Sequence, residues 1–160
     1  MITINAASDI YTLACQQIIP ISVSEAWRFF SSPQNLVMMT PPKMQFEITN
    51  GIPAQMYEGQ IITYLVCVLP FVKTKWVTEI THVNSNHYFV DEQRFGPYAM
   101  WHHEHRFQAV SNGTLVQDKV TYKLPLGWLG NMLGGTYVKQ NLTNIFEFRS
   151  QFLRERFGDV

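Results

Sequence analysis

The chain has 160 residues, of which 46% are hydrophobic and 14% aromatic, which is enough apolar material for one sizeable core. Basic and acidic residues number 12 each, so the formal net charge is zero. Without a basic surface, we expect no nucleic-acid partner and no electrostatic attachment to a membrane. No apolar stretch is long enough to span a bilayer, so we also expect no integral membrane association.

The chain carries two cysteines, Cys15 and Cys67, too few for a disulfide framework. Its first residues lack the basic and apolar regions of a signal peptide. We therefore expect reduced thiols in a cytoplasmic protein. No repeat, low-complexity tract or linker interrupts the sequence, which predicts one domain over residues 1–160.

The N-terminal part predicts one strand followed by two short helices. Residues 11–18 form the strand, and Pro20 ends it. Ser22 and Glu25 have the spacing of a capping box, which begins the first helix. The second helix begins at Pro33, and the Thr-Pro-Pro sequence at 40–42 ends it.

The rest of the chain predicts a series of strands and then one long helix. Apolar residues recur at three- and four-residue steps between about 129 and 157, and the glycine pair at 134–135 should weaken or kink the first turns. We therefore predict an α+β fold, in which a curved antiparallel sheet wraps around the C-terminal helix and leaves a cavity between them. The predicted strands are 44–49, 56–68, 73–83, 88–95, 99–110 and 114–124.

Three segments resemble the START-like (SRPBCC) superfamily, in particular its polyketide cyclase/dehydrase-like branch of uncharacterised bacterial ligand-binding proteins. They are PISVSEAWRFFSSPQNLVMMTPP at 20–42, FVDEQRFGPYAMWHHEHRF at 89–107 and GTLVQDKVTYKLPLGWLG at 113–130. The resemblance implies a helix-grip fold with a deep apolar cavity. It implies no cofactor, because the superfamily holds enzymes, lipid carriers and hormone receptors alike.

The stretch QRFGPYAMWHHEHRF at 93–107 gathers three histidines and a glutamate. Side chains alternate between the two faces of a strand, so this cluster divides. His102 and Glu104 are predicted to face solvent. Trp101, His103 and His105 are predicted to face the cavity.

The next strand brings an acid to the same face. Asn112-Gly113 is a strong hairpin signal, and as the centre of the turn it places His105 opposite Val120 and His103 opposite Tyr122. Asp118 then lies diagonal to His105, within hydrogen-bond reach. On the preceding strand, Asp91 and Gln93 share the parity of Phe89, which would turn them inward too.

Two specialised interpretations of the histidines compete with a simpler one. A metal site would use His103 and His105 with Asp118 or Asp91. Alternatively, Asp118, Tyr122, Gln93 or water supplies the hydrogen-bond partners of both imidazoles. Since two histidines separated by a single residue are a weak motif, we predict no metal. An acid/base centre of His103, His105, Asp118 and Tyr122 would suit enolisation, dehydration or ring closure.

The leading hypothesis is binding or transport of a small hydrophobic ligand, of lipid, polyketide-like or aromatic character. A cyclase or dehydratase and a regulatory protein-interaction module are the alternatives. An exposed sheet edge would allow a homodimer. The predicted ligand-binding residues are Tyr64, Trp76, Gln93, Trp101, His103, His105, Asp118, Tyr122 and Tyr137.

Overall fold

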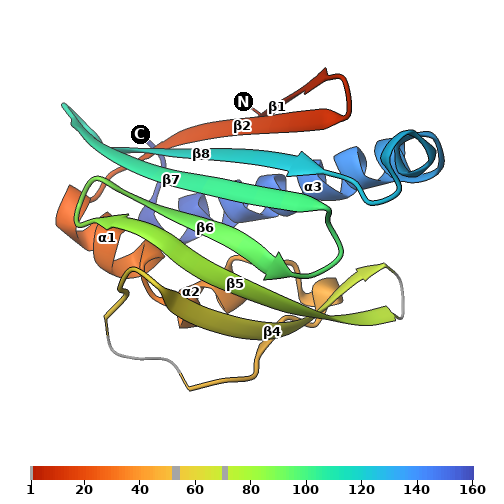
Figure 1. The fold of residues 1–160 in the computed structure, drawn as a ribbon. Coiled ribbons are helices and arrows are strands. Elements are labelled where there is room, and N and C mark those ends of the chain that lie inside the picture. The colour runs from red at the N-terminus through yellow and green to blue at the C-terminus, as the bar shows by residue number, and fades with distance from the viewer. Residues whose placement is uncertain (1, 52–54, 70–71) are drawn as a thin grey trace.

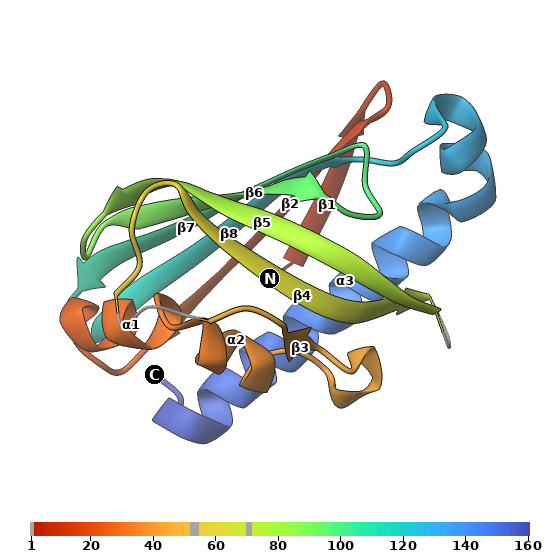
Figure 2. The same ribbon diagram turned by 60° about the horizontal axis from the view of Figure 1, so that its bottom comes forward.

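A computed structural model describes residues 2–51, 55–69 and 72–160. Over these residues eight antiparallel strands form one curved sheet, in the order β1-β2-β8-β7-β6-β5-β4-β3. The long C-terminal helix lies against one face of the sheet (Figures 1 and 2). This is the predicted α+β fold class. The strands are β1 (Ile2–Ala7), β2 (Ile10–Ile19), β3 (Glu47–Ile48), β4 (Gln60–Leu69), β5 (Val72–Asn84), β6 (Tyr88–Phe95), β7 (Met100–Val110) and β8 (Gly113–Lys123).

The helical segments are α1 (Val23–Phe30), α2 (Pro33–Met38), the short 3-10 helix η1 (Pro42–Met44) and α3 (Gly127–Phe157). Figure 2 shows α1 and α2 below the sheet, near the C-terminal end of α3. These elements close one end of the space between the sheet and α3. No helix in the described part of the chain combines the length and the apolar character needed to cross a membrane.

Two strands, not one, precede the short helices. The predicted first strand corresponds to β2, and β1 pairs with it in a hairpin whose turn holds Ser8 in the left-handed region (φ 58°). Most side chains of β1 are exposed. This edge strand therefore lacks the buried alternating face by which sequence patterns reveal a strand.

A capping box begins α1. The Ser22 backbone N–H donates to Glu25 Oε2 at 3.0 Å, and the Glu25 backbone N–H donates to Ser22 Oγ at 3.4 Å. The two residues thus satisfy amides of the first turn that have no partner within the helix. This arrangement confirms the predicted helix start.

Replacing Ser22 by alanine should lower the free energy of unfolding by about 1 kcal/mol, because the first turn loses its side-chain acceptor. Urea unfolding followed by circular dichroism measures the change. Ser32→Ala is the matched control, since Ser32 precedes α2 without making a capping hydrogen bond. Equal losses in the two variants would mean that the capping box contributes nothing.

The β7–β8 hairpin has a register two residues away from the predicted one. The turn residues are Ser111 and Asn112, and Val110 pairs with Gly113. Consequently His105 lies opposite Asp118, not Val120, and His103 lies opposite Val120, not Tyr122. Because the shift is an even number of residues, every side chain stays on its predicted face of the sheet.

Gly113 explains the difference. Its φ is +144°, and a Cβ atom there would lie 2.1 Å from the carbonyl oxygen of Ile19 in β2. The glycine therefore permits close contact between two neighbouring chain segments. The sequence predicts Asn112 and Gly113 as the two central turn residues. In the structure Gly113 is instead the first residue of β8.

The α3 helix packs a narrow face against the sheet. Among its described side chains, Leu142, Phe146, Arg149 and Leu153 are buried, and Leu142 and Phe146 join the core around Tyr122. In Figure 1 the first turns are seen nearly end-on while the rest lies along the sheet, so the helix changes direction.

Candidate functional site

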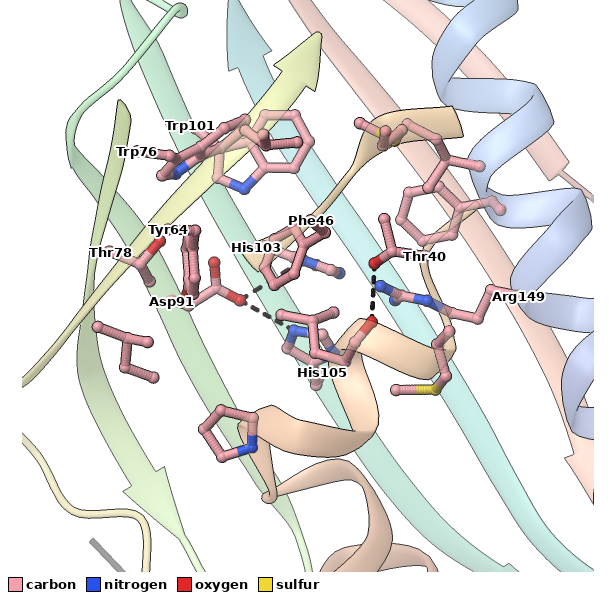
Figure 3. A pocket seen from close by; sticks show the side chains of 18 of the residues that line it. Thr40, Phe46, Tyr64, Trp76, Thr78, Asp91, Trp101, His103, His105 and Arg149 are labelled. Carbon is pink, nitrogen blue, oxygen red and sulfur yellow. Dashed lines mark hydrogen bonds and ion pairs between the residues drawn. The ribbon is translucent and has the colours of Figure 1, made fainter. Parts of the chain in front are cut away.

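A cavity of about 150 Å³ lies between the sheet and α3, and α1, α2 and η1 close its remaining side (Figure 3). Most of its wall is apolar and rich in rings. Trp76 and Trp101 meet edge to face with centroids 5.2 Å apart, and Tyr98 packs against both. Aromatic rings in this arrangement form a rigid apolar wall. Tyr64, Ile62, Phe89, Leu142, Ile145 and Phe146 extend it.

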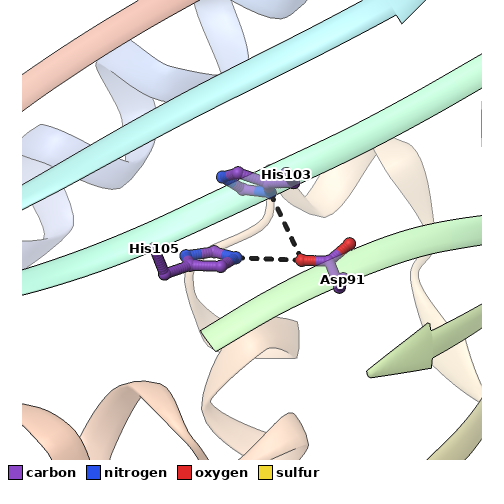
Figure 4. A group of neighbouring side chains, drawn as sticks. All are labelled: Asp91, His103 and His105. Carbon is purple, nitrogen blue, oxygen red and sulfur yellow. Dashed lines mark hydrogen bonds and ion pairs between the residues drawn. The ribbon is translucent and has the colours of Figure 1, made fainter. Parts of the chain in front are cut away.

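Three polar side chains from β6 and β7 interrupt this wall (Figure 4). Asp91 pairs with His103 across the two strands, and His105 lies two residues further along β7. Asp91 Oδ2 is 2.9 Å from His105 Nε2 and 3.5 Å from His103 Nδ1. The imidazole centroids are 3.7 Å apart. The three donor atoms lie within 4.8 Å of one another, close enough to share one metal ion.

A second carboxylate contacts the ring nitrogens of both imidazoles that do not contact Asp91. Asp118 Oδ1 is 3.0 Å from His103 Nε2 and 2.9 Å from His105 Nδ1, although only the first contact has hydrogen-bond alignment. Arg149 of α3 donates from Nη1 to the same oxygen at 3.2 Å. The five side chains, Asp91, His103, His105, Asp118 and Arg149, are called the buried polar network below.

The charges of this network depend on one another. Burial opposes ionisation of Asp118, but the charge of Arg149 and the contacts with both histidines outweigh it, so the pKa of Asp118 lies well below its ordinary value. Burial likewise opposes ionisation of Asp91, yet the charges of His103 and His105 lower the pKa of that carboxyl. Both acids are therefore stabilised as carboxylates.

The two imidazoles differ in spite of their proximity. Burial, together with the charge of His105, lowers the pKa of His103. Burial also disfavours the charged form of His105, but its contacts with Asp118 and Asp91 prevail and raise the pKa of that imidazole. The surroundings thus favour the protonated form more strongly at His105 than at His103.

A family model described as domain of unknown function (DUF8410) matches residues 32–157. The chain belongs to the DUF8410 family. The DUF8410 match includes all five residues of the buried polar network, whereas β1, β2 and α1 precede it. A search among curated proteins finds no match.

Solved structures share the fold of this DUF8410 member at low sequence identity. Protein TTHA0849 from Thermus thermophilus is 18% identical with a TM-score of 0.69, covering 91% of this chain and 96% of its own. A Thalictrum flavum norcoclaurine synthase point mutant, in complex with a transition-state analogue, is 12% identical (TM-score 0.64; 95% and 99% covered). Major latex-like protein 151 from Panax ginseng is also 12% identical (TM-score 0.68; 93% and 98% covered). These likenesses show the helix-grip fold that the resemblance implied.

Five of the nine predicted ligand-binding residues line the cavity of this DUF8410 member. They are Tyr64, Trp76, Trp101, His103 and His105. Tyr64 reaches the cavity from β4 and Trp76 from β5, where the two residues are cross-strand partners. The predicted alternation along β7 is present, because His103 and His105 are buried while His102 contacts Glu92 on the outer face.

The other four predicted residues do not contribute to the cavity wall. Asp118 lies behind the imidazoles, and Gln93 bonds the backbone of Tyr98 through both its amide oxygen and nitrogen. Tyr122 is fully buried and stacks on Tyr11 with centroids 5.1 Å apart. Tyr137 is 46% exposed. The predicted inward parity of Asp118 and Tyr122 was therefore correct for the sheet, but parity does not separate core positions from cavity positions.

Sequence reasoning missed Arg149 and gave Asp91 only a minor role. Arginine is rarely buried unless it is paired, so an arginine within a helix ordinarily indicates a solvated face. Arg149 lies four and seven residues after Ile145 and Leu142, and four before Leu153, which places it on the apolar face of α3. That spacing, together with an inward acid on the sheet, was the available signal.

Proposed function

We propose that the protein binds a small hydrophobic molecule whose apolar body lies against the aromatic wall and whose polar end reaches the buried polar network. One observation carries this proposal: the cavity between sheet and α3 is apolar over most of its wall, and its charged groups are gathered where Asp91, His103, His105 and Arg149 meet. A few convergent polar groups in an apolar pocket are typical of small-molecule sites.

The cavity volume favours a compact ligand over a long-chain lipid. Apolar cavities of about 150 Å³ accommodate a single benzene-sized ring. A cavity of about 150 Å³ lined by Trp76, Trp101 and Tyr98 therefore suits an aromatic ring with a short substituent. Among the three predicted ligand classes, the aromatic one is best supported.

A buried donor of the polar network describes the polar end of the ligand. Arg149 Nε has no hydrogen-bond partner among the described residues, and its side chain belongs to the cavity wall. An unpaired buried N–H is costly, and a ligand oxygen that accepts a hydrogen bond removes that cost. We therefore infer that the ligand carries an acceptor group such as a carbonyl or carboxylate.

Isothermal titration calorimetry with acetophenone and ethylbenzene tests this function. Acetophenone combines one ring with an acceptor oxygen, and at about 0.6 kcal/mol per non-hydrogen atom its Kd would be on the order of 0.1 mM. Ethylbenzene lacks the acceptor and should bind about tenfold more weakly. Palmitate should show no saturable binding.

A pair of variants on α3 provides the control. Ile145→Trp places a large side chain in the cavity and should weaken acetophenone binding at least about tenfold. Tyr137→Trp introduces the same residue at an exposed position of the same helix and should leave the Kd unchanged. Unchanged affinity in Ile145→Trp, with its fold intact by circular dichroism, would place the ligand elsewhere.

The two alternative functions have less support and stay predictions. A cyclase or dehydratase would use His103, His105, Asp118 and Tyr122 at one surface, but only the histidines reach the cavity wall. Burial, reinforced by neighbouring Tyr11, raises the pKa of Tyr122 to about 12, which does not suit proton transfer near neutral pH. A regulatory interaction module, a homodimer and a cytoplasmic location rest on the sequence alone.

A further inference from the structure

We propose that Asp91, His103 and His105 bind a divalent transition-metal ion, of the class of Zn²⁺ or Fe²⁺, at the polar end of the cavity. Two imidazole nitrogens and one carboxylate oxygen are donors that such ions accept, with positions left open for water or a ligand. The inference does not depend on the hydrophobic ligand proposed above.

The donor separations match a shared ion. Bonds of about 2.0–2.1 Å in tetrahedral geometry place neighbouring donor atoms about 3.4 Å apart. Asp91 Oδ2 lies 2.9 Å from His105 Nε2 and 3.5 Å from His103 Nδ1, and all three donors lie within 4.8 Å of one another. Small side-chain adjustments therefore suffice to surround an ion.

The second nitrogen of each imidazole supports the same assignment. Asp118 Oδ1 lies 3.0 Å from His103 Nε2 and 2.9 Å from His105 Nδ1. A neutral imidazole carries a single N–H. His103 Nε2 has hydrogen-bond alignment with Asp118, and when His105 also carries its N–H on Nδ1, the nitrogen beside Asp118, the lone pairs of both rings face Asp91. These lone pairs and the Asp91 carboxylate oxygen repel one another. A cation bound between them would replace this repulsion by three coordination bonds. A carboxylate behind a metal-bound histidine is the usual way such ligands are oriented.

Arg149 determines on which side of the imidazoles the ion binds. Its Nη1 atom lies 3.2 Å from Asp118 Oδ1, so a positive charge already occupies that side. The Asp91 side holds no such cation among the described residues, and the Asp91 side chain keeps 17% of its surface exposed at the cavity. The open coordination position would therefore face the cavity.

Titration of metal-stripped wild-type protein tests the site directly. We expect Zn²⁺ to bind one ion per chain with a Kd in the micromolar range or tighter, and to raise the melting temperature. Co²⁺ should give visible d–d absorption without the near-ultraviolet thiolate band that ligation by Cys15 or Cys67 would produce. Absence of saturable 1:1 binding, or a thiolate band, would overturn the proposal.

Adjacent histidines on opposite faces of β7 supply matched variants. His103→Gln should weaken Zn²⁺ binding at least about 100-fold, whereas His102→Gln, on the outer face beside Glu92, should change it less than about twofold. A larger effect of His102→Gln than of His103→Gln would contradict the assignment. The Zn²⁺ titration of the wild-type protein tests the site by itself, so the proposal stays testable even if His103→Gln misfolds.

The outcome of the metal experiment does not depend on the outcome of the ligand experiment. Acetophenone binding to metal-stripped protein tests the cavity alone, and Zn²⁺ binding without acetophenone tests the three ligands alone. Zn²⁺ binding without acetophenone binding would support the metal site and remove the proposed function, and the reverse result would do the opposite.

Discussion

Arg149→Met should lower the free energy of unfolding by about 3–5 kcal/mol, because it leaves the Asp118 carboxylate buried without its cationic partner. Both side chains are almost inaccessible, at 8% and 7% exposure, so water cannot replace the lost contact. Methionine retains much of the apolar length of arginine, so the loss reports chiefly on charge. Urea unfolding monitored by circular dichroism measures it.

Two further variants separate the ion pair from general damage to α3. Arg154→Met removes an exposed arginine from the same helix and should change stability by less than about 0.5 kcal/mol. Adding Asp118→Asn to Arg149→Met removes the unpaired charge and should recover at least about 2 kcal/mol. Failure of the double variant to recover stability would show that Arg149 acts through packing.

Gly113→Ala should cost more than about 3 kcal/mol, or prevent folding, because two unfavourable effects coincide. The backbone there has a φ of +144°, and the added Cβ would lie 2.1 Å from the Ile19 carbonyl oxygen and 2.9 Å from Pro20 Cα. Both neighbours are backbone atoms, so no side-chain rotation relieves the clash. Soluble yield and urea unfolding provide the measurement.

Alanine substitutions at two other glycines separate the backbone strain from the steric clash. Gly59 has a φ of +84° with nothing within 4 Å of an added Cβ, so Gly59→Ala tests backbone strain alone and should cost about 1–2 kcal/mol. Gly51 has neither constraint, and Gly51→Ala should fall within about 0.5 kcal/mol of wild type. If Gly113→Ala cost no more than Gly59→Ala, the close approach to β2 would be unimportant.

Periodicity accounts for most of what could be predicted. A period of two along β7 places His103 and His105 inside and His102 outside, and this holds for any register that shifts by an even number of residues. The helical period of the last thirty residues predicts a helix against the sheet. These inferences succeed because each depends on local geometry alone.

What could not be predicted depends on contacts between distant segments. The choice between Asp118 and Val120 as the partner of His105 follows from the approach of β8 to Ile19, which no local pattern encodes. The contact of Arg149 with Asp118 joins residues 31 positions apart. Tyr122 and His103 share a face of the sheet, yet the rings of Tyr11 and Tyr98 pack on Tyr122, and only His103 lines the cavity.

The Arg149–Asp118 contact also limits how a molecule can reach the cavity. Lifting α3 from the sheet would separate two buried opposite charges, and the strands are held by their ladders of hydrogen bonds. By contrast, α2 is six residues long, has no side-chain cap and leaves Val37 and Met38 partly exposed. Short segments with few buried contacts open at the lowest free energy. We therefore expect the passage to the cavity to run past α2, with α3 as the fixed wall opposite it.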